Sequence, residues 1–149
     1  EEMVAKSWQE KFEHPAEPEI TMVPASLEAK WGRGKLLIAT PRLIDAEIRK
    51  IPKGRVARLG EVRAELARQH GAAVTCPLTT GIFLRVAAEL ANEEEAAGKK
   101  RISPYWRVVR DDGELIEKLP GGCENQARRL REEGHRVVQK GKKWRLVTT

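Results

Sequence analysis

The sequence has little cysteine and few aromatic residues. Only 2 of its 149 residues are cysteine, and aromatic side chains make up 5% of the chain. Cys76 and Cys123 are too few for a disulfide framework or a cysteine-based metal site. We therefore expect no metal or other cofactor, and a reducing, cytoplasmic environment.

Long hydrophobic runs are also absent. No apolar run approaches the roughly 20 residues of a membrane-spanning helix, and the mean hydropathy is -0.53. Residues 1–20 are acidic and polar, which predicts no signal peptide. We expect a chain that does not enter a membrane, with one domain large enough to bury a core.

Charge is unevenly distributed along the chain. Residues 1–34 contain 4 basic and 7 acidic residues, a net charge of −3, whereas 24 basic and 15 acidic residues give residues 35–149 a net charge of +9. A basic body indicates a polyanionic partner, and nucleic acid is the commonest one. The alternative is a solvated basic surface without a specific partner.

Residues 1–39 are predicted to form an irregular arm packed on a body over residues 40–149. The arm contains three prolines before residue 25 and no sustained hydrophobic period. We expect one short helix over about residues 4–12, and a possible short strand over residues 36–39. Trp8 and Trp31 are predicted to anchor the arm on the body, because burying an indole ring stabilises such a contact.

Residues 40–92 predict a helix-turn-helix preceded by another helix. Thr40 is a good N-cap and Pro41 suits the first helical position. Further helices are predicted over residues 61–70 and from residue 79 or 80 to about 92. The predicted buried stripe of this third helix is Ile82, Phe83, Val86 and Leu90.

The opposite side of the third helix is mostly small, so it could approach a nucleic-acid backbone closely. A charge-segregated loop after this helix adds three cations that could contact phosphates. The predicted nucleic-acid contacts are Thr79, Thr80, Gly81, Leu84, Arg85, Ala88, Lys99, Lys100 and Arg101.

Two hairpins are predicted in the last third of the chain. Asp111-Asp112-Gly113 is a strong turn signal between residues 107–110 and 114–117, and this hairpin would be the wing of a winged helix. A helix over residues 124–133 follows. Residues 135–139 and 143–147 predict a basic terminal hairpin with Trp144 packed on it.

The stretch Ile102–Val109 combines residue types that are unusual on a surface. Pro104 fixes the backbone before it enters a strand. Tyr105, Trp106 and Arg107 then supply two aromatic rings and a planar cation in succession. Such a set suits a pocket that holds a flat ring.

The frame Pro104-x-x-Arg107-Val108 resembles the Pro-Cys-His-Arg-Val sequence of the alkylguanine-DNA alkyltransferases, which move an alkyl group from guanine onto that cysteine. Thr40-Pro41 and the helix ending Ile51-Pro-Lys-Gly-Arg-Val56 resemble the opening of that family's DNA-binding domain. Pro120-Gly121-Gly122 and the helix closing Glu133-Gly-His-Arg-Val137 resemble its end. The resemblance implies an α/β winged helix-turn-helix fold over residues 40–137.

The resemblance also implies a mode of binding. In that family the third helix enters the DNA minor groove, and an extruded guanine enters a pocket. On this chain the implied base-pocket residues are Tyr105, Trp106, Arg107, Gly121, Gly122 and Glu133.

The chain departs from the family at the reacting groups. Tyr105 occupies the position of the acceptor cysteine and Trp106 that of its histidine, so the thiolate and its base are both missing. A phenol with an ordinary pKa of about 10 cannot replace an activated thiol. Leu59 also stands where the family usually has a tyrosine that helps to rotate the nucleotide.

The leading hypothesis is therefore a non-catalytic, monomeric protein that binds double-stranded DNA. It would be similar to the alkyltransferase-like proteins, which lack the cysteine, bind alkylated guanine and pass the site to excision repair. A repair protein is accordingly a possible partner.

Three alternatives remain open at this stage. Tyr105 and Trp106 could fill the pocket, which would leave a winged-helix binder of DNA or RNA without lesion recognition. Cys76 or Cys123 could be a relocated alkyl acceptor. The acidic arm and the basic hairpin could instead be surfaces of a protein or ribonucleoprotein interaction module.

Overall fold

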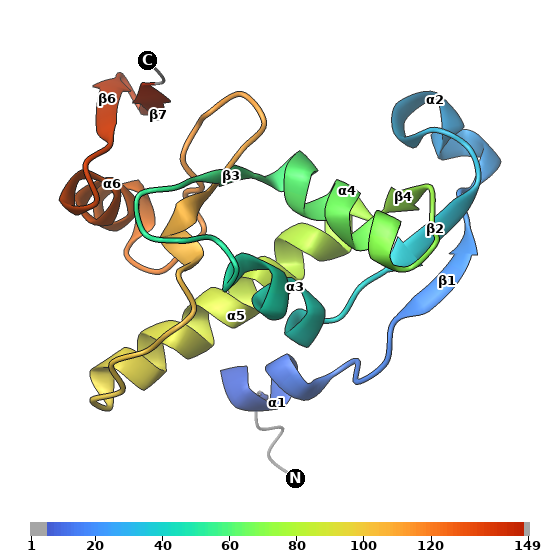
Figure 1. Cartoon of the computed structure of the whole chain (residues 1–149), viewed down its shortest axis with the longest axis horizontal. Helices are drawn as coiled ribbons and strands as arrows, with labels where there is room; N and C mark the ends of the chain where they lie inside the picture. The colour runs from blue at the N-terminus through green and yellow to red at the C-terminus, as the bar shows by residue number, and fades with distance from the viewer. Residues whose placement is uncertain (1–5, 148–149) are drawn as a thin grey trace, which may run out of the picture.

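The computed structural model describes residues 6–147. Six α-helices, two 3₁₀ turns and seven short strands are assigned within this range (Figure 1). Their order is α1 (Trp8–Glu13), β1 (Glu19–Met22), η1 (Ala25–Leu27), α2 (Glu28–Trp31), β2 (Lys35–Ile38), α3 (Pro41–Ile48), β3 (Ala57–Arg58), α4 (Leu59–Gln69), β4 (Val74–Thr75), α5 (Pro77–Ala96), η2 (Tyr105–Arg107), β5 (Val108–Val109), α6 (Gly122–Glu132), β6 (Arg136–Lys140) and β7 (Lys143–Val147).

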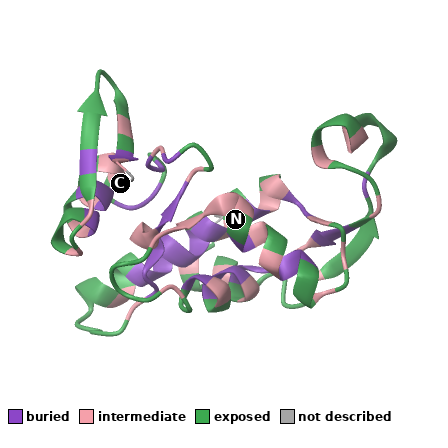
Figure 2. Ribbon diagram, turned by 45° about the horizontal axis from the view of Figure 1, so that its top comes forward, coloured by how far each residue is buried: buried purple, intermediate pink, exposed green. Residues whose placement is uncertain are grey.

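The main core lies where α3, α4 and α5 meet. Thr40 caps α3, because its Oγ1 accepts a hydrogen bond from the Leu43 amide at 3.1 Å. Ile44 and Ile48 of α3 pack against Leu84 of α5, and all three are at most 2% exposed. Buried residues concentrate in these central helices, whereas the arm and the terminal hairpin are largely exposed (Figure 2).

The predicted helix-turn-helix is confirmed. It consists of α4, a turn over residues 70–76 that contains β4, and α5. Gly71 adopts φ +66° just after α4, a left-handed conformation that favours glycine and ends the helix. α5 is longer than predicted at both ends, since Pro77 occupies its first turn and the helix continues to Ala96.

The arm contains a strand that the sequence analysis did not predict. β1 pairs antiparallel with β2, and β2 pairs parallel with β4, so the arm joins the body through a small three-stranded sheet. β1 has only four residues, all of them exposed, so its sequence shows no period long enough to predict a strand. Trp31 is half-buried and packs against the cluster of Val23, Leu36 and Cys76, which joins the arm to a residue of the body and agrees with its predicted anchoring role. The predicted helix is α1, and Val4 and Ala5 lie outside the described residues.

The prediction that residues 107–110 and 114–117 pair as a two-stranded hairpin is wrong. Its turn forms, since the Arg110 amide donates to the Glu114 carbonyl at 2.9 Å. However, β5 pairs parallel with β3. Residues 113–115 instead run along β7, where the Leu115 amide donates to the Trp144 carbonyl at 2.9 Å. The predicted terminal hairpin is confirmed as β6 and β7, although Lys140, expected in the turn, pairs with Lys143 as part of β6.

Asp111 caps α4 from this turn. Its Oδ1 accepts a hydrogen bond from the Gly60 amide at 2.7 Å. A Cβ on Gly60 would lie 2.9 Å from the same oxygen, so a larger residue there would displace the Asp111 carboxylate from this position. The contact joins the loop that runs beside β7 to the start of the helix-turn-helix.

We predict that Asp111→Ala lowers the free energy of unfolding by about 1–2 kcal/mol, because it removes the acceptor of an N-terminal helix amide. Urea denaturation followed by circular dichroism measures the change. Glu117→Ala is the control, since that carboxylate is 74% exposed on the same loop. Equal stability of the two variants would contradict the capping role.

Candidate nucleic-acid interface

The exposed side of the N-terminal half of α5 carries two large apolar residues. Leu78 is 68% exposed and Ile82 is 59% exposed. Gly81 and Arg85 are exposed on the same side, because positions i, i+3, i+4 and i+7 share one face of a helix. Exposed apolar side chains that adjoin each other are typical of a contact surface.

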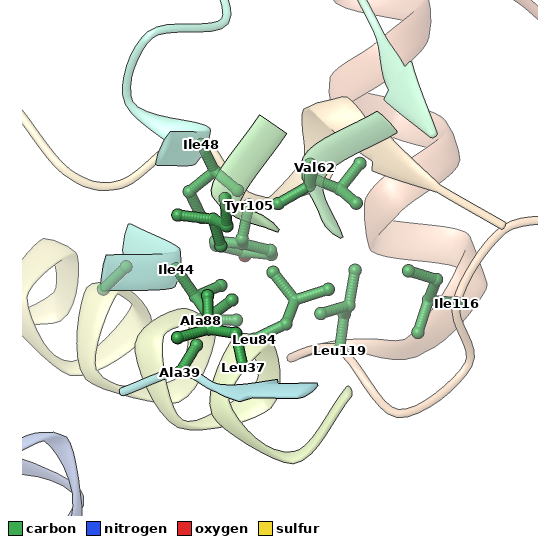
Figure 3. Close-up of a cluster of buried hydrophobic side chains, with 13 residues drawn as sticks. Leu37, Ala39, Ile44, Ile48, Val62, Leu84, Ala88, Tyr105, Ile116 and Leu119 are labelled. Atoms are coloured by element: carbon green, nitrogen blue, oxygen red, sulfur yellow. The ribbon is translucent and has the colours of Figure 1, made fainter. Parts of the chain in front are cut away.

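The other side of α5 corrects the predicted orientation of this helix. Thr80, Leu84 and Ala88 are at most 2% exposed, so the prediction that they contact nucleic acid is wrong. Leu84 and Ala88 lie in the core cluster with residues of α3 and α4 (Figure 3), and the Thr80 hydroxyl donates to the Cys76 carbonyl at 2.7 Å. Ile82 was predicted to be buried, but it is 59% exposed. Gly81 and Arg85 remain at the surface, and Thr79 is half-buried.

Gly81 is unusual because no packing requires it. An ideal Cβ at this position would have no neighbouring atom within 4 Å. A glycine inside a helix costs about 0.5–1 kcal/mol relative to alanine. Its absent side chain leaves the backbone of α5 open to the close approach of another molecule.

This face of α5 forms one wall of a groove of about 760 Å³. Leu59, the loop around residues 110–119 and two residues of α1 complete the groove. Among the described residues that line the groove none is acidic, and one of them, Arg110, lies 4.0 Å from Glu117. The cations that line the groove are Lys11, Arg85, Arg110 and Lys118.

The other predicted phosphate contacts lie at the opposite end of α5. A helix rises about 1.5 Å per residue, so Lys99, Lys100 and Arg101 follow a 20-residue helix whose first turns form the groove. Lys99 Nζ also lies 3.0 Å from Glu94 Oε2. The structure therefore does not bring these three cations together with Arg85.

Tyr105 is enclosed by the main core. Its side chain is 0% exposed, and its hydroxyl accepts a hydrogen bond from Asn125 Nδ2 at 3.1 Å. Its ring meets that of Trp106 edge to face, with centroids 5.3 Å apart. Burial raises the pKa of the phenol, although the nearby Arg129 guanidinium opposes this shift. Tyr105 thus has no accessible face on which a base could stack (Figure 3).

Arg107 and Trp106 both bind Glu133. Arg107 Nη2 lies 2.8 Å from Glu133 Oε2, and Trp106 Nε1 donates to the same oxygen at 3.0 Å. Arg107 Nη1 also donates to the carbonyl of Ile51 at 2.8 Å. Burial acts to raise the pKa of Glu133, but the hydrogen bonds from Arg107 and Trp106 outweigh it and hold this pKa below its ordinary value. The network joins η2 to the end of α6 and to the segment after α3.

Gly121 and Gly122 turn the chain into α6. Both have positive φ values, +75° and +68°. A Cβ on Gly121 would overlap Asn125, whose amide donates to the Pro120 carbonyl at 2.9 Å and also to Tyr105. Of the six predicted pocket residues, Tyr105 is buried and Gly121 is exposed, while Trp106, Arg107, Gly122 and Glu133 are half-buried. The prediction that Tyr105 lines an open base pocket is wrong, and the alternative that the rings fill this space agrees with the structure.

The sequence analysis missed several residues of this region. Gln126 is 0% exposed, and it holds the loop by donating to the Val108 carbonyl at 2.7 Å and accepting from the Ile116 amide at 2.8 Å. Leu78, which precedes Ile82 by one helical turn, was also not predicted to be part of the interface. That spacing was the available sign of an exposed apolar pair.

Neither cysteine is freely exposed, since Cys76, just before α5, is buried and Cys123 is half-buried. Burial and the nearby Glu117 carboxylate raise the pKa of Cys123, which lowers its thiolate fraction. Within residues 6–147, no three histidine, cysteine or acidic side chains group together as metal ligands. In the same range, no helix has the length and apolarity to cross a membrane.

Comparisons with known proteins give two structural neighbours. No protein-family model matches the sequence, and no curated protein matches it. The chain is similar to S. pombe Atl1 in complex with damaged DNA containing O6-carboxymethylguanine, with 21% identity, 72% of this chain and 87% of that chain covered, and a TM-score of 0.49. It is also similar to S. pombe ATL in complex with DNA, with 23% identity, coverage of 72% and 85%, and a TM-score of 0.48.

We predict opposite effects of Gly81→Ala on stability and on binding. The free energy of unfolding should rise by about 0.5–1 kcal/mol, because alanine favours the helix and meets no neighbour. The affinity for a polyanionic partner should fall, because the methyl group keeps the partner away from the backbone. Urea denaturation and a binding titration measure the two effects. Asn92→Ala, farther along α5, should leave binding unchanged, and a Gly81→Ala variant with unchanged affinity would exclude close approach.

We predict that Glu133 contributes stability that depends on pH. Because its pKa is lower in the folded protein than its ordinary value of 4.5, its contribution is complete above that value and is lost as the pH falls through the folded pKa. Glu133→Gln should destabilise the fold by about 2–4 kcal/mol at neutral pH, since Arg107 loses its charged partner. It should also flatten the acid limb of a stability-against-pH curve.

The matched control for this prediction is Glu132→Gln. Glu132 is 61% exposed, and its one ion pair within the described residues joins it to Arg128 of the same helix. An acid limb that is identical in wild type and Glu133→Gln would contradict the role given to Glu133.

Proposed function

We propose that this protein binds double-stranded DNA without catalysing a reaction, and that the N-terminal half of α5 makes the main contact. The observation that carries this proposal is the exposed face of Leu78, Gly81, Ile82 and Arg85 beside a groove lined with cations. A duplex offers both phosphates for the cations and an apolar groove floor for the aliphatic side chains.

The residue types on this face suit a helix that enters a groove of DNA. Apolar wedges such as leucine and isoleucine contact sugars and base edges, particularly in the minor groove. Gly81 would allow the helix backbone to approach, and Arg85 would reach a phosphate or a base edge. The retained frame of Pro104, Arg107 and Val108 adds the expectation of a role connected with the repair of alkylated DNA.

The packing around Tyr105 supports binding without chemistry and without an open lesion pocket. An alkylated guanine could enter only if Tyr105 left a core in which it is 0% exposed. Truncating such a buried aromatic residue typically costs about 3–5 kcal/mol. We therefore propose that the protein recognises duplex DNA through α5 rather than the alkyl group itself.

The test is a set of titrations against a plain duplex, the same duplex with O6-alkylguanine, and an RNA duplex of equal length. We expect similar affinities for both DNA duplexes, and weaker binding of RNA. Arg85→Ala should reduce the affinity for plain DNA and lower the salt dependence by about one phosphate contact. Arg101→Ala, at the other end of α5, should change neither quantity.

Three other outcomes would overturn parts of the proposal. A strong preference for the alkylated duplex would show lesion recognition. Binding that depends little on salt would favour a protein partner. An increase in the intact mass of the protein after incubation with alkylated DNA would reveal a cysteine acceptor.

A further inference from the structure

We infer that the N-terminal arm is part of the DNA-binding surface, with α1 placing Trp8 and Lys11 against the DNA backbone beside α5. This inference rests on the proposed function, and it assigns a role to a segment outside the resemblance over residues 40–137. The arm would thus extend the contact beyond the helix-turn-helix.

The first argument is position. α1 packs beside α5 (Figure 1), and Trp8 and Lys11 both line the same groove as Arg85. Lys11 Nζ lies 4.4 Å from the centroid of the Trp8 ring, and Arg85 Cζ lies 5.6 Å from it. The indole ring therefore lies close to one cation from the arm and one from α5. Such contacts orient both cations while their charges remain available to an anion.

The second argument is how α1 distributes its charges. Residues 1–34 carry a net charge of −3, yet the α1 residues that line the groove are a tryptophan and a lysine. Glu10 turns back to Ser7, whose hydroxyl lies 3.2 Å from Glu10 Oε1. Glu13 accepts a hydrogen bond from Gln9 at 2.8 Å. An arm that covered the surface by imitating DNA would instead direct these carboxylates at Arg85.

The third argument is that the far side of α1 is fixed to the body. Arg42 of α3 lies over the Phe12 ring at 5.1 Å, and its Nη2 is 3.9 Å from Glu13 Oε1. A helix of 6 residues is too short to be stable alone in water, so these contacts and the Ser7 capping box define its place. Lys11 is therefore held at a set position relative to Arg85.

The fourth argument is charge complementarity across the whole groove. Lys11 of α1, Arg85 of α5, and Arg110 and Lys118 of the loop before α6 all line it. Within the described part of the chain, no ion pair involves Lys11, Arg85 or Lys118. Cations from three separate segments thus face a shared space, which suits the phosphates of one duplex.

The experiment compares Lys11→Ala, Trp8→Ala and Arg85→Ala in titrations of the full chain against a plain duplex at two salt concentrations. We expect Lys11→Ala to weaken binding by about 3- to 10-fold and to lower the salt slope by about one. Trp8→Ala should weaken binding at least as much, because Lys11 and Arg85 both lose the ring beside them. Circular dichroism and thermal unfolding check that each variant keeps its fold.

The matched control is Lys30→Ala. Lys30 is an exposed lysine of the arm in α2, and it does not line the groove. This variant has the same change in net charge as Lys11→Ala, so it should bind with the affinity and salt slope of the wild type. Equal losses in Lys30→Ala and Lys11→Ala would reduce the effect to overall charge and overturn the inference.

The remaining outcomes separate this inference from the proposed function. If Arg85→Ala weakens binding and Lys11→Ala does not, the arm makes no DNA contact, but the proposed function stands. If Lys11→Ala or Trp8→Ala tightens binding, the arm covers the surface, and the inference is wrong. If the wild type does not bind the duplex, the proposed function fails and the inference fails with it.

Discussion

The packing of α5 against α3 is the constraint on which the interface depends. Leu84, Ala88 and Ala91 of α5 lie in one cluster with Ile44 and Ile48, and this packing fixes the rotation of the helix. Once these residues are buried, Leu78, Ile82 and Arg85 have to point outward. The exposed apolar pair is therefore a consequence of how the core is filled.

A second interaction, the ion pair between Arg107 and Glu133, holds together segments from the C-terminal half of the domain. The Arg107–Glu133 ion pair connects η2, the end of α6 and the segment after α3, while Tyr105 fills the space between them. In this chain the frame positions helices, and the surface that faces outward belongs to α5, α1 and the loop around residues 110–119.

The sequence predicted local structure better than it predicted orientation. The Thr40 cap, the helix-turn-helix and the turn at Asp111 depend on neighbouring residues, so they could be inferred directly. Which face of α5 is buried could not be inferred in this way. Ile82 is large and apolar and so favours burial, whereas Leu84 and Ala88 are the residues that fit against α3. Strand β1 and the enclosure of Tyr105 depend on contacts between distant segments. The groove was also missed, since α1 and the loop near residue 118 meet only in the fold.

The most direct test of the central claim is hydrogen–deuterium exchange of the full chain with and without a plain DNA duplex. Binding through α5 predicts that protection on adding DNA is strongest over residues 77–86. Protection centred on residues 104–109 and 121–133, with residues 77–86 unchanged, would contradict the account.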